Sequence, residues 1–167
     1  DPGLDVDRRR IRGGLHGLDR RARALFNADD EILSVRVWRK DETGSYQHVY
    51  TFIDQERLAS LNISVDEIEQ ARKLTPVPVE AVAQERILLQ NVSLAPDLAL
   101  LRLSAASADG RIVISASLRP ERILRLARGT GLYRVYLVDG QGHALAHTDG
   151  QKVLSHADLS GLAVVKD

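Results

Sequence analysis

Histidines are the residues of this 167-residue chain best suited to metal binding, because cysteine is absent. Two of the five, His143 and His147, stand four residues apart. On a helix that spacing would place both rings on one face. The surrounding sequence instead predicts a strand, in which four residues span about 13 Å. The two rings then cannot share one ion, so we expect no metal site and no other cofactor.

Nucleophilic catalysis lacks its usual local pattern in this chain. Serine, histidine and aspartate all occur, but no Gly-x-Ser-x-Gly turn is present. The pairs Gly129-x-Gly131 and Gly140-x-Gly142 lack the spacing of a phosphate-binding loop. The absence of cysteine also excludes thiol catalysis. We therefore expect no catalytic residue in this chain.

Arg102 is the residue that most strongly suggests a binding site. It interrupts the apolar run 98–103, on the same face as Leu98 and Leu100. A buried arginine needs a partner, which is either a carboxylate of the protein or an anionic ligand. Further candidates for the lining of such a pocket, with ordinary sheet packing as their alternative, are Trp38, Tyr50 and Asn91.

Composition narrows the class of protein. The chain holds 23 basic and 23 acidic residues, so its formal net charge is zero, which argues against a dedicated nucleic-acid binder. Its mixture of apolar and charged residues is typical of a folded domain. The sequence contains no run of 18 apolar residues, the length needed for a helix that crosses a membrane. Because the chain begins with Asp1 and contains no methionine, we expect it to be a fragment of a longer protein.

Residues 1–30 are predicted to form a long helix. Apolar residues recur at steps of four and three along one seam, which comprises Ile11, Leu15, Leu18, Ala22 and Leu25, with Leu4 ahead of them. Three glycines weaken this helix by roughly 1 kcal/mol each relative to alanine, and arginines crowd its other faces. Such a helix needs a partner, either its own domain or a second copy of the chain.

Alternation of apolar and polar residues begins at residue 32 and predicts strands over residues 32–38, 46–53, 86–94, 98–106 and 111–118. In the first strand the alternation places Leu33, Val35 and Val37 on one face, opposite Trp38. In the second it places Tyr46, His48, Tyr50 and Phe52 together.

Helices are predicted between the second and third strands. Asp54 can cap a short helix, and Ser64 with Glu67 forms a capping box for the next one. Pro76 and Pro78 end that helix, and one more turn is possible over residues 79–84. A short helix over 121–128 and a hairpin of 132–138 with 143–148 follow. The remaining residues show no clear period.

Two segments near the C-terminal end resemble a known family. The strand 112–118, a polar break and then Ile123-Leu124 look like the last strand of a Cache unit and its connecting helix. Residues 130–149, TGLYRVYLVDGQGHALAHTD, are similar to the start of the second unit of double Cache domains. Cache domains are extracytoplasmic (periplasmic), PAS-like sensor domains of bacterial transmembrane receptors.

The resemblance implies an α+β fold, in which a long N-terminal helix (1–30) precedes a membrane-distal unit with a PAS-like five-stranded antiparallel sheet (31–128). Residues 129–167 would begin a partial membrane-proximal unit. The ligand would lie between the sheet and the helices inserted after its second strand. Ser115 occupies the position at which many members hold an amine with aspartate. Arg36-x-Trp38 shares letters with the Arg-x-Trp-Tyr amino-acid motif, but Arg39 replaces its tyrosine.

The function implied is ligand sensing in signal transduction. The full-length protein would be anchored in the inner membrane, would form a homodimer through its first helix, and would relay binding of a small, anionic ligand to a cytoplasmic output such as a nucleotide (adenylate) cyclase. The alternative is a ligand-free dimerisation or protein-interaction module of a membrane receptor.

Overall fold

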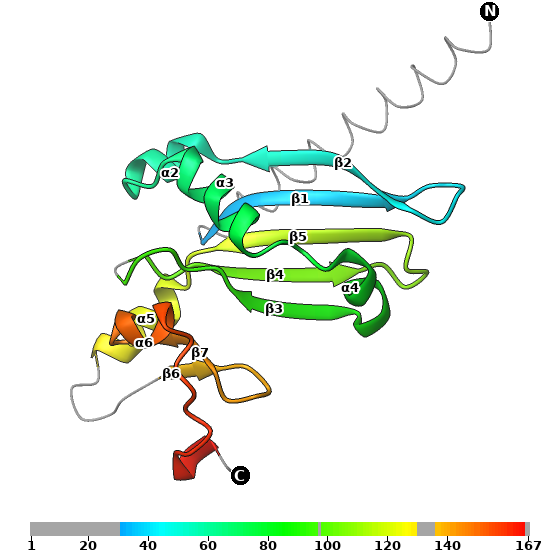
Figure 1. Ribbon diagram of the computed structural model, residues 1–167. Helices are drawn as coiled ribbons and strands as arrows, with labels where there is room; N and C mark the ends of the chain where they lie inside the picture. The colour runs from blue at the N-terminus through cyan, green and yellow to red at the C-terminus, as the bar shows by residue number, and fades with distance from the viewer. Residues whose placement is uncertain (1–30, 97, 130–135, 166–167) are drawn as a thin grey trace, which may run out of the picture.

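The sheet at the centre of the molecule confirms the predicted α+β class. The computed structural model describes residues 31–96, 98–129 and 136–165. Five antiparallel strands lie in the order β2-β1-β5-β4-β3 (Figure 1). They are β1 (Ile32–Lys40), β2 (Tyr46–Ile53), β3 (Ile87–Asn91), β4 (Leu101–Ala106) and β5 (Ile112–Leu118). The helix expected over residues 1–30, with the dimer contact assigned to it, lies outside the described residues.

The two tight hairpins of the sheet turn at glycines. Gly44, between β1 and β2, has φ +87°, and Gly110, between β4 and β5, has φ +67°. This left-handed region is accessible to glycine without the steric cost that a side chain brings. The five strands fall close to their predicted positions, although β3 and β4 are shorter than the alternation suggested.

Two register shifts in the pairing of β1, one with β5 and one with β2, change which side chains share a face of the sheet. The register of β1 against β5 shifts between Ile32 and Ser34, and Leu33 packs with Leu58 beneath the helices instead of with Val35. The register of β1 against β2 shifts between Val37 and Trp38. A bulge inserts one unpaired residue, which exchanges the faces of all residues beyond it.

The second shift divides the aromatic face predicted for β2. Trp38 pairs with His48, and Val37 pairs with Tyr50. Tyr46 belongs to an apolar cluster with Trp38, whereas Tyr50 and Phe52 pack with Val35 and Val37 in a different cluster. The prediction that Tyr46, His48, Tyr50 and Phe52 share a face is therefore wrong.

Three helices connect β2 to β3: α2 (Gln55–Ser60), α3 (Val65–Leu74) and α4 (Val79–Glu85). Asp54 caps α2 by accepting a hydrogen bond from the backbone N–H of Arg57 at 2.9 Å. The predicted capping box of α3 is confirmed, because Ser64 Oγ accepts from Glu67 N and Glu67 accepts from Ser64 N. Local sequence thus determines where α2 and α3 begin.

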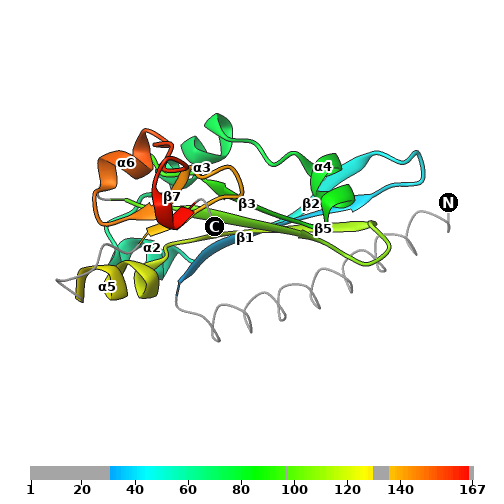
Figure 2. The ribbon, with the colours of Figure 1, turned by 90° about the horizontal axis from the view of Figure 1, so that it is seen from below.

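Helices α3 and α4 lie on one side of the sheet, and α5 (Glu121–Gly129) lies on the other (Figure 2). The α5 side also exposes apolar residues of β3, β4 and β5, namely Ile87, Leu103, Ile112 and Ile114. No helix among the described residues is long and apolar enough to cross a membrane.

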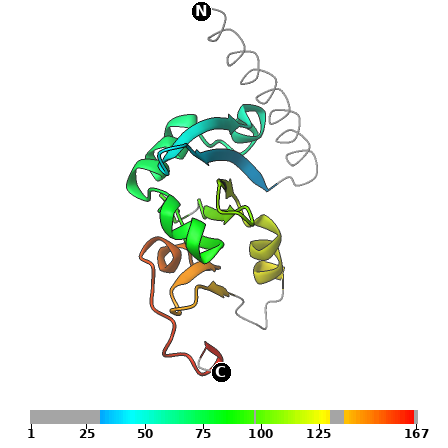
Figure 3. The same cartoon turned by 90° about the vertical axis from the view of Figure 1, so that its right-hand side faces the viewer.

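After α5 the chain forms a small second sheet of β6 (Tyr136–Val138) and β7 (Ala144–His147). Helix α6 (Gly150–Leu154) follows, and a short 3-10 turn covers Ala163–Val165. Viewed along the large sheet, this hairpin lies beyond β3, with α5 and α6 on opposite sides (Figure 3). The hairpin was predicted. Helix α6 was not, because five residues are too few to show a helical period.

The hairpin is attached to the edge of the large sheet through buried polar and backbone contacts. The Asn91 side-chain amide donates to the carbonyls of Ala144, at 3.1 Å, and Val153, at 2.7 Å. Gly150 packs so closely on the β3–β4 connection that a Cβ would lie 1.7 Å from the Pro96 carbonyl oxygen.

We expect Gly150→Ala to lower the free energy of unfolding by about 1–3 kcal/mol, because the added methyl must displace the Pro96 backbone. Gly161→Ala is the matched control, since nothing lies within 4 Å of its Cβ position. Urea titration of both variants checks this. Equal stability of the two variants would show that α6 is not docked on the β3–β4 connection.

Candidate functional site

The helix side of the sheet has two apolar ends. Beneath α2 and α3 lies one buried cluster, which comprises Leu33, Leu58, Ile63, Ile68, Ala71, Val92, Leu98 and Leu100. Beneath α4 lies the other, which comprises Trp38, Val79, Val82 and Val113. Burial of apolar surface contributes about 25 cal/mol of stabilising free energy per Å². These two clusters therefore hold the helices on the sheet.

Between the two apolar ends, the same side of the sheet is polar. The strand register aligns Gln90, Arg102 and Ser117 in one row, with Ser34 next to Ser117. A second row aligns Ser104, Ser115 and Arg36. Directly paired residues share a face, so these side chains form one polar strip: Ser34, Arg36, Gln90, Arg102, Ser104, Ser115 and Ser117.

Arg102 is the most deeply buried charge of the strip, with 2% of its surface exposed. Its guanidinium donates to the carbonyl of Thr75 and, at 3.5 Å, to that of Ala71. Both carbonyls belong to the C-terminal end of α3, where the helix dipole favours a cation. Burial, followed by the charges of Arg72 and Arg36, lowers the pKa of Arg102 to about 10.

Two further arginines lie near enough to Arg102 for their charges to lower its pKa. Arg72 lies on the buried side of α3 and pairs with Glu69 one turn earlier. Burial lowers the pKa of Arg72, and Arg36 lowers it further against the attraction of Glu69. Arg36, from β1, stacks on Trp38 with its guanidinium carbon 4.8 Å from the ring centroid. We call Arg36, Arg72 and Arg102 the arginine cluster.

Several buried polar atoms at the strip have no hydrogen-bond partner among the described residues. They include Nε and Nη2 of Arg72, the hydroxyl of Ser34 and the side-chain oxygen of Gln90. An unsatisfied buried polar group costs about 1–3 kcal/mol. Native proteins carry few of these groups, and four of the six atoms of this kind in the described residues lie at the strip, which makes it the candidate site.

The structure brings together three of the five candidate residues. Arg102 and Ser115 lie in the strip, where the Ser115 hydroxyl hydrogen-bonds that of Ser104 at 3.1 Å, and Trp38 borders it. Tyr50 lies on the opposite side of the sheet, because the bulge in the β1–β2 pairing reverses its face. Asn91 holds the C-terminal hairpin instead.

Arg72 was not among the residues that the sequence predicted for the site. Its pattern was visible, because Arg72 falls four residues after Ile68 and beside Ala71, on the apolar stripe of the predicted helix. A charged residue on a buried stripe needs a partner, as at Arg102. Ser34 and Gln90 offered no such signal, since serine and glutamine are unremarkable in strands.

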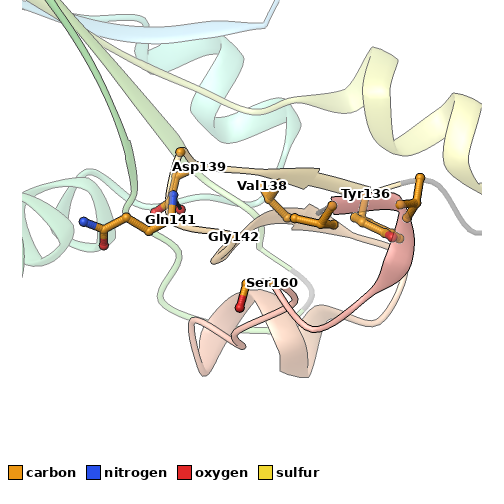
Figure 4. A pocket seen from close by; sticks show the side chains of 9 residues that line it. Tyr136, Val138, Asp139, Gln141, Gly142 and Ser160 are labelled. Atoms are coloured by element: carbon orange, nitrogen blue, oxygen red, sulfur yellow. Dashed lines mark hydrogen bonds between the residues drawn. The ribbon is translucent and has the colours of Figure 1, made fainter. Parts of the chain in front are cut away.

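A separate hollow of about 660 Å³ lies between the β6–β7 turn and the C-terminal segment (Figure 4). Its turn carboxylate, Asp139, accepts hydrogen bonds from the backbone N–H groups of Gln141, at 2.8 Å, and His143, at 2.9 Å. Asp139 also contacts the His143 ring at 3.3 Å. These groups hold the turn, so the hollow lacks the unpartnered charge of the arginine cluster.

The histidines considered as metal ligands have structural contacts. His147 is buried against Tyr136 with ring centroids 5.8 Å apart, and its Nδ1 accepts from Asp149 N at 2.8 Å. His143 forms an isolated antiparallel backbone bridge with Asp158. Within residues 31–96, 98–129 and 136–165, no group of three histidine, aspartate or glutamate side chains could hold a metal.

Similarity to other proteins contributes no identification. Comparisons with protein-family models, with curated proteins and with solved structures give no match for this chain. The geometry of the arginine cluster is therefore the observation from which we infer function.

We expect Arg102→Met to leave the free energy of unfolding unchanged or to raise it, by up to about 1–4 kcal/mol, because an apolar side chain of similar length avoids desolvation of the charge. Urea titration measures this, with exposed Arg111→Met as the control. A loss of about 2 kcal/mol or more would identify Arg102 as a structural cap of α3.

Proposed function

We propose that this chain is the extracytoplasmic sensor domain of a bacterial membrane-bound signalling protein, with a PAS-like fold of the Cache type. The five-stranded antiparallel sheet, with helices inserted between β2 and β3, supports this proposal. In it, residues 31–128 are the membrane-distal unit and 129–167 begin a proximal one. The arginine cluster lies between the sheet and α3, where the resemblance places a ligand.

One observation carries the ligand class: the charges of Arg36 and Arg72 act on Arg102, and among the described residues Glu69 is the carboxylate that pairs with a member of the cluster. Such a site favours an anion. A ligand amine would require a carboxylate partner, but Ser115 stands at the matching position and hydrogen-bonds Ser104. The ligand proposed is therefore a small anion recognised through its negative charge, without an amine contact.

Signal relay follows from the elements that the anion would touch. Arg72 belongs to α3, whereas Arg36 and Arg102 belong to the sheet, so an anion between them would tie α3 to β1 and β4. In the proposed full-length protein this change would pass through a homodimer to a cytoplasmic output such as a nucleotide cyclase. The population shift cannot exceed the ligand's differential affinity for the two states.

An interaction module without a small ligand is the second candidate. The exposed residues on the α5 side of the sheet favour it, since Ile87 is 65% exposed and Ile112, Ile114 and Leu103 lie on the adjoining strands. Contiguous apolar surface of this kind is typical of protein interfaces.

Thermal unfolding distinguishes the two candidates. We expect carboxylates, phosphate or sulfate to raise the melting temperature of the chain in a dose-dependent way. At a hundredfold excess of ligand over Kd, binding raises the free energy of unfolding by about 2.7 kcal/mol. Amino acids, purines and divalent cations complete the panel. Arg102→Met should abolish the shift and Arg111→Met should preserve it. A flat response to every compound would favour the interaction module.

Anion binding should also depend on pH through His48, which pairs with Trp38 at the border of the strip. Partial burial and the charges of Arg36 and Arg72 lower the pKa of His48 below 6.5. A bound anion favours the charged ring and so raises this pKa, which means that binding takes up a proton.

We therefore expect affinity to increase as the pH falls below 6.5, measured with the tightest anion of the panel whose own charge is constant between about pH 5 and pH 8. His48→Gln should remove the pH dependence. A pH profile that persists in this variant would assign the effect to another group.

A further inference from the structure

The charge balance of the arginine cluster specifies more than the sign of its ligand. Arg36, Arg72 and Arg102 contribute three positive charges, and Glu69 contributes one negative charge through its pair with Arg72. In the described part of the chain, no ion pair joins Arg36 or Arg102 to a carboxylate. Two positive charges are therefore left without a compensating carboxylate.

The remaining contacts of these two arginines do not supply charge. Arg102 donates to two neutral carbonyls, and Arg36 stacks on a neutral indole. Carbonyls and aromatic faces stabilise a cation, but they do not neutralise its charge, and the burial of Arg102 weakens screening of its charge by water. The positive charges of Arg36 and Arg102 therefore repel each other, and each also repels the charge of Arg72.

Arg72 shows where an anion would make hydrogen bonds. Its side chain is 6% exposed, and its Nε and Nη2 have no hydrogen-bond partner among the residues that the structure describes. In an arginine these two N–H groups point in parallel and match the two oxygens of a carboxylate or a phosphate. The buried hydroxyl of Ser34, which also has no partner in the described part of the chain, offers one further hydrogen bond from the sheet.

We propose that the arginine cluster binds a small dianion between α3 and the sheet, an inference that rests on the proposed anion-sensing function. Two negative charges balance the two uncompensated guanidinium groups, whereas a monoanion leaves one of them without a compensating charge. A dicarboxylate and an inorganic oxyanion such as sulfate share this chemistry.

Titration calorimetry at constant ionic strength tests the valence directly. Succinate and succinamate have nearly the same shape and differ by one charge, so we expect succinate to bind at least tenfold more tightly. Sulfate and chloride make the same comparison of charge for inorganic anions. The affinities of sulfate and succinate then show whether the cluster prefers a compact oxyanion or a dicarboxylate. Preference for either dianion over its singly charged counterpart supports the proposal.

Variants of the cluster should change this preference in opposite directions. Arg36→Gln or Arg72→Gln removes one guanidinium, and we expect the preference for dianions to fall by about tenfold in each. Glu69→Gln removes the carboxylate, so it should tighten the binding of every anion. Exposed Arg111→Gln is the control and should leave all affinities unchanged.

The outcomes separate the two proposals. If succinate and succinamate bind equally, and sulfate and chloride bind equally, the dianion proposal is overturned while anion sensing stands. If no anion binds, the proposed function itself fails. A preference that survives in both Arg36→Gln and Arg72→Gln would place the dianion elsewhere on the chain and would also overturn the assignment to this cluster.

Discussion

Burial of Arg72 and Arg102 beneath α3, with half-buried Arg36 beside them, is the constraint around which the helix side of the sheet is arranged. Each charge removed from water requires a partner. Arg102 donates to the C-terminal carbonyls of α3, and Arg72 forms an ion pair with Glu69. Arg36 stacks on the face of Trp38. The end of α3 at Thr75 is therefore both a local sequence effect and a contact to the sheet.

The apolar packing of the domain is displaced to the two ends of this side. One cluster anchors α2 and α3, the other anchors α4, and serines occupy the space between them. A continuous apolar interior would stabilise the fold more. Polar interiors with incomplete hydrogen bonding are characteristic of binding sites, where stability is given up for recognition.

Strand β3 joins this site to the C-terminal hairpin. Gln90 lies in the polar strip, and Asn91, the next residue, donates to the carbonyls of Ala144 and Val153. Because neighbouring strand residues point to opposite faces, a single strand presents one side chain to the candidate site and the next to the hairpin. The contact of Gly150 with Pro96 adds a second attachment at the same edge.

The sequence by itself determined the local features of this protein. Alternation located the strands, Ser64 and Glu67 located the start of α3, and the position of Arg102 within an apolar run predicted its burial. These features depend on residues a few positions apart, whose periodicity and hydrogen bonding can be read directly.

Tertiary structure alone decided the faces and the site. Single-residue bulges reversed the expected faces of Leu33 and Tyr50, because a strand's register depends on its partner. Arg36, Arg72 and Arg102 lie more than 25 residues apart in sequence and meet only because β1, α3 and β4 pack together. Their joint charge, which determines what the site can bind, is a property of that packing and of no local pattern.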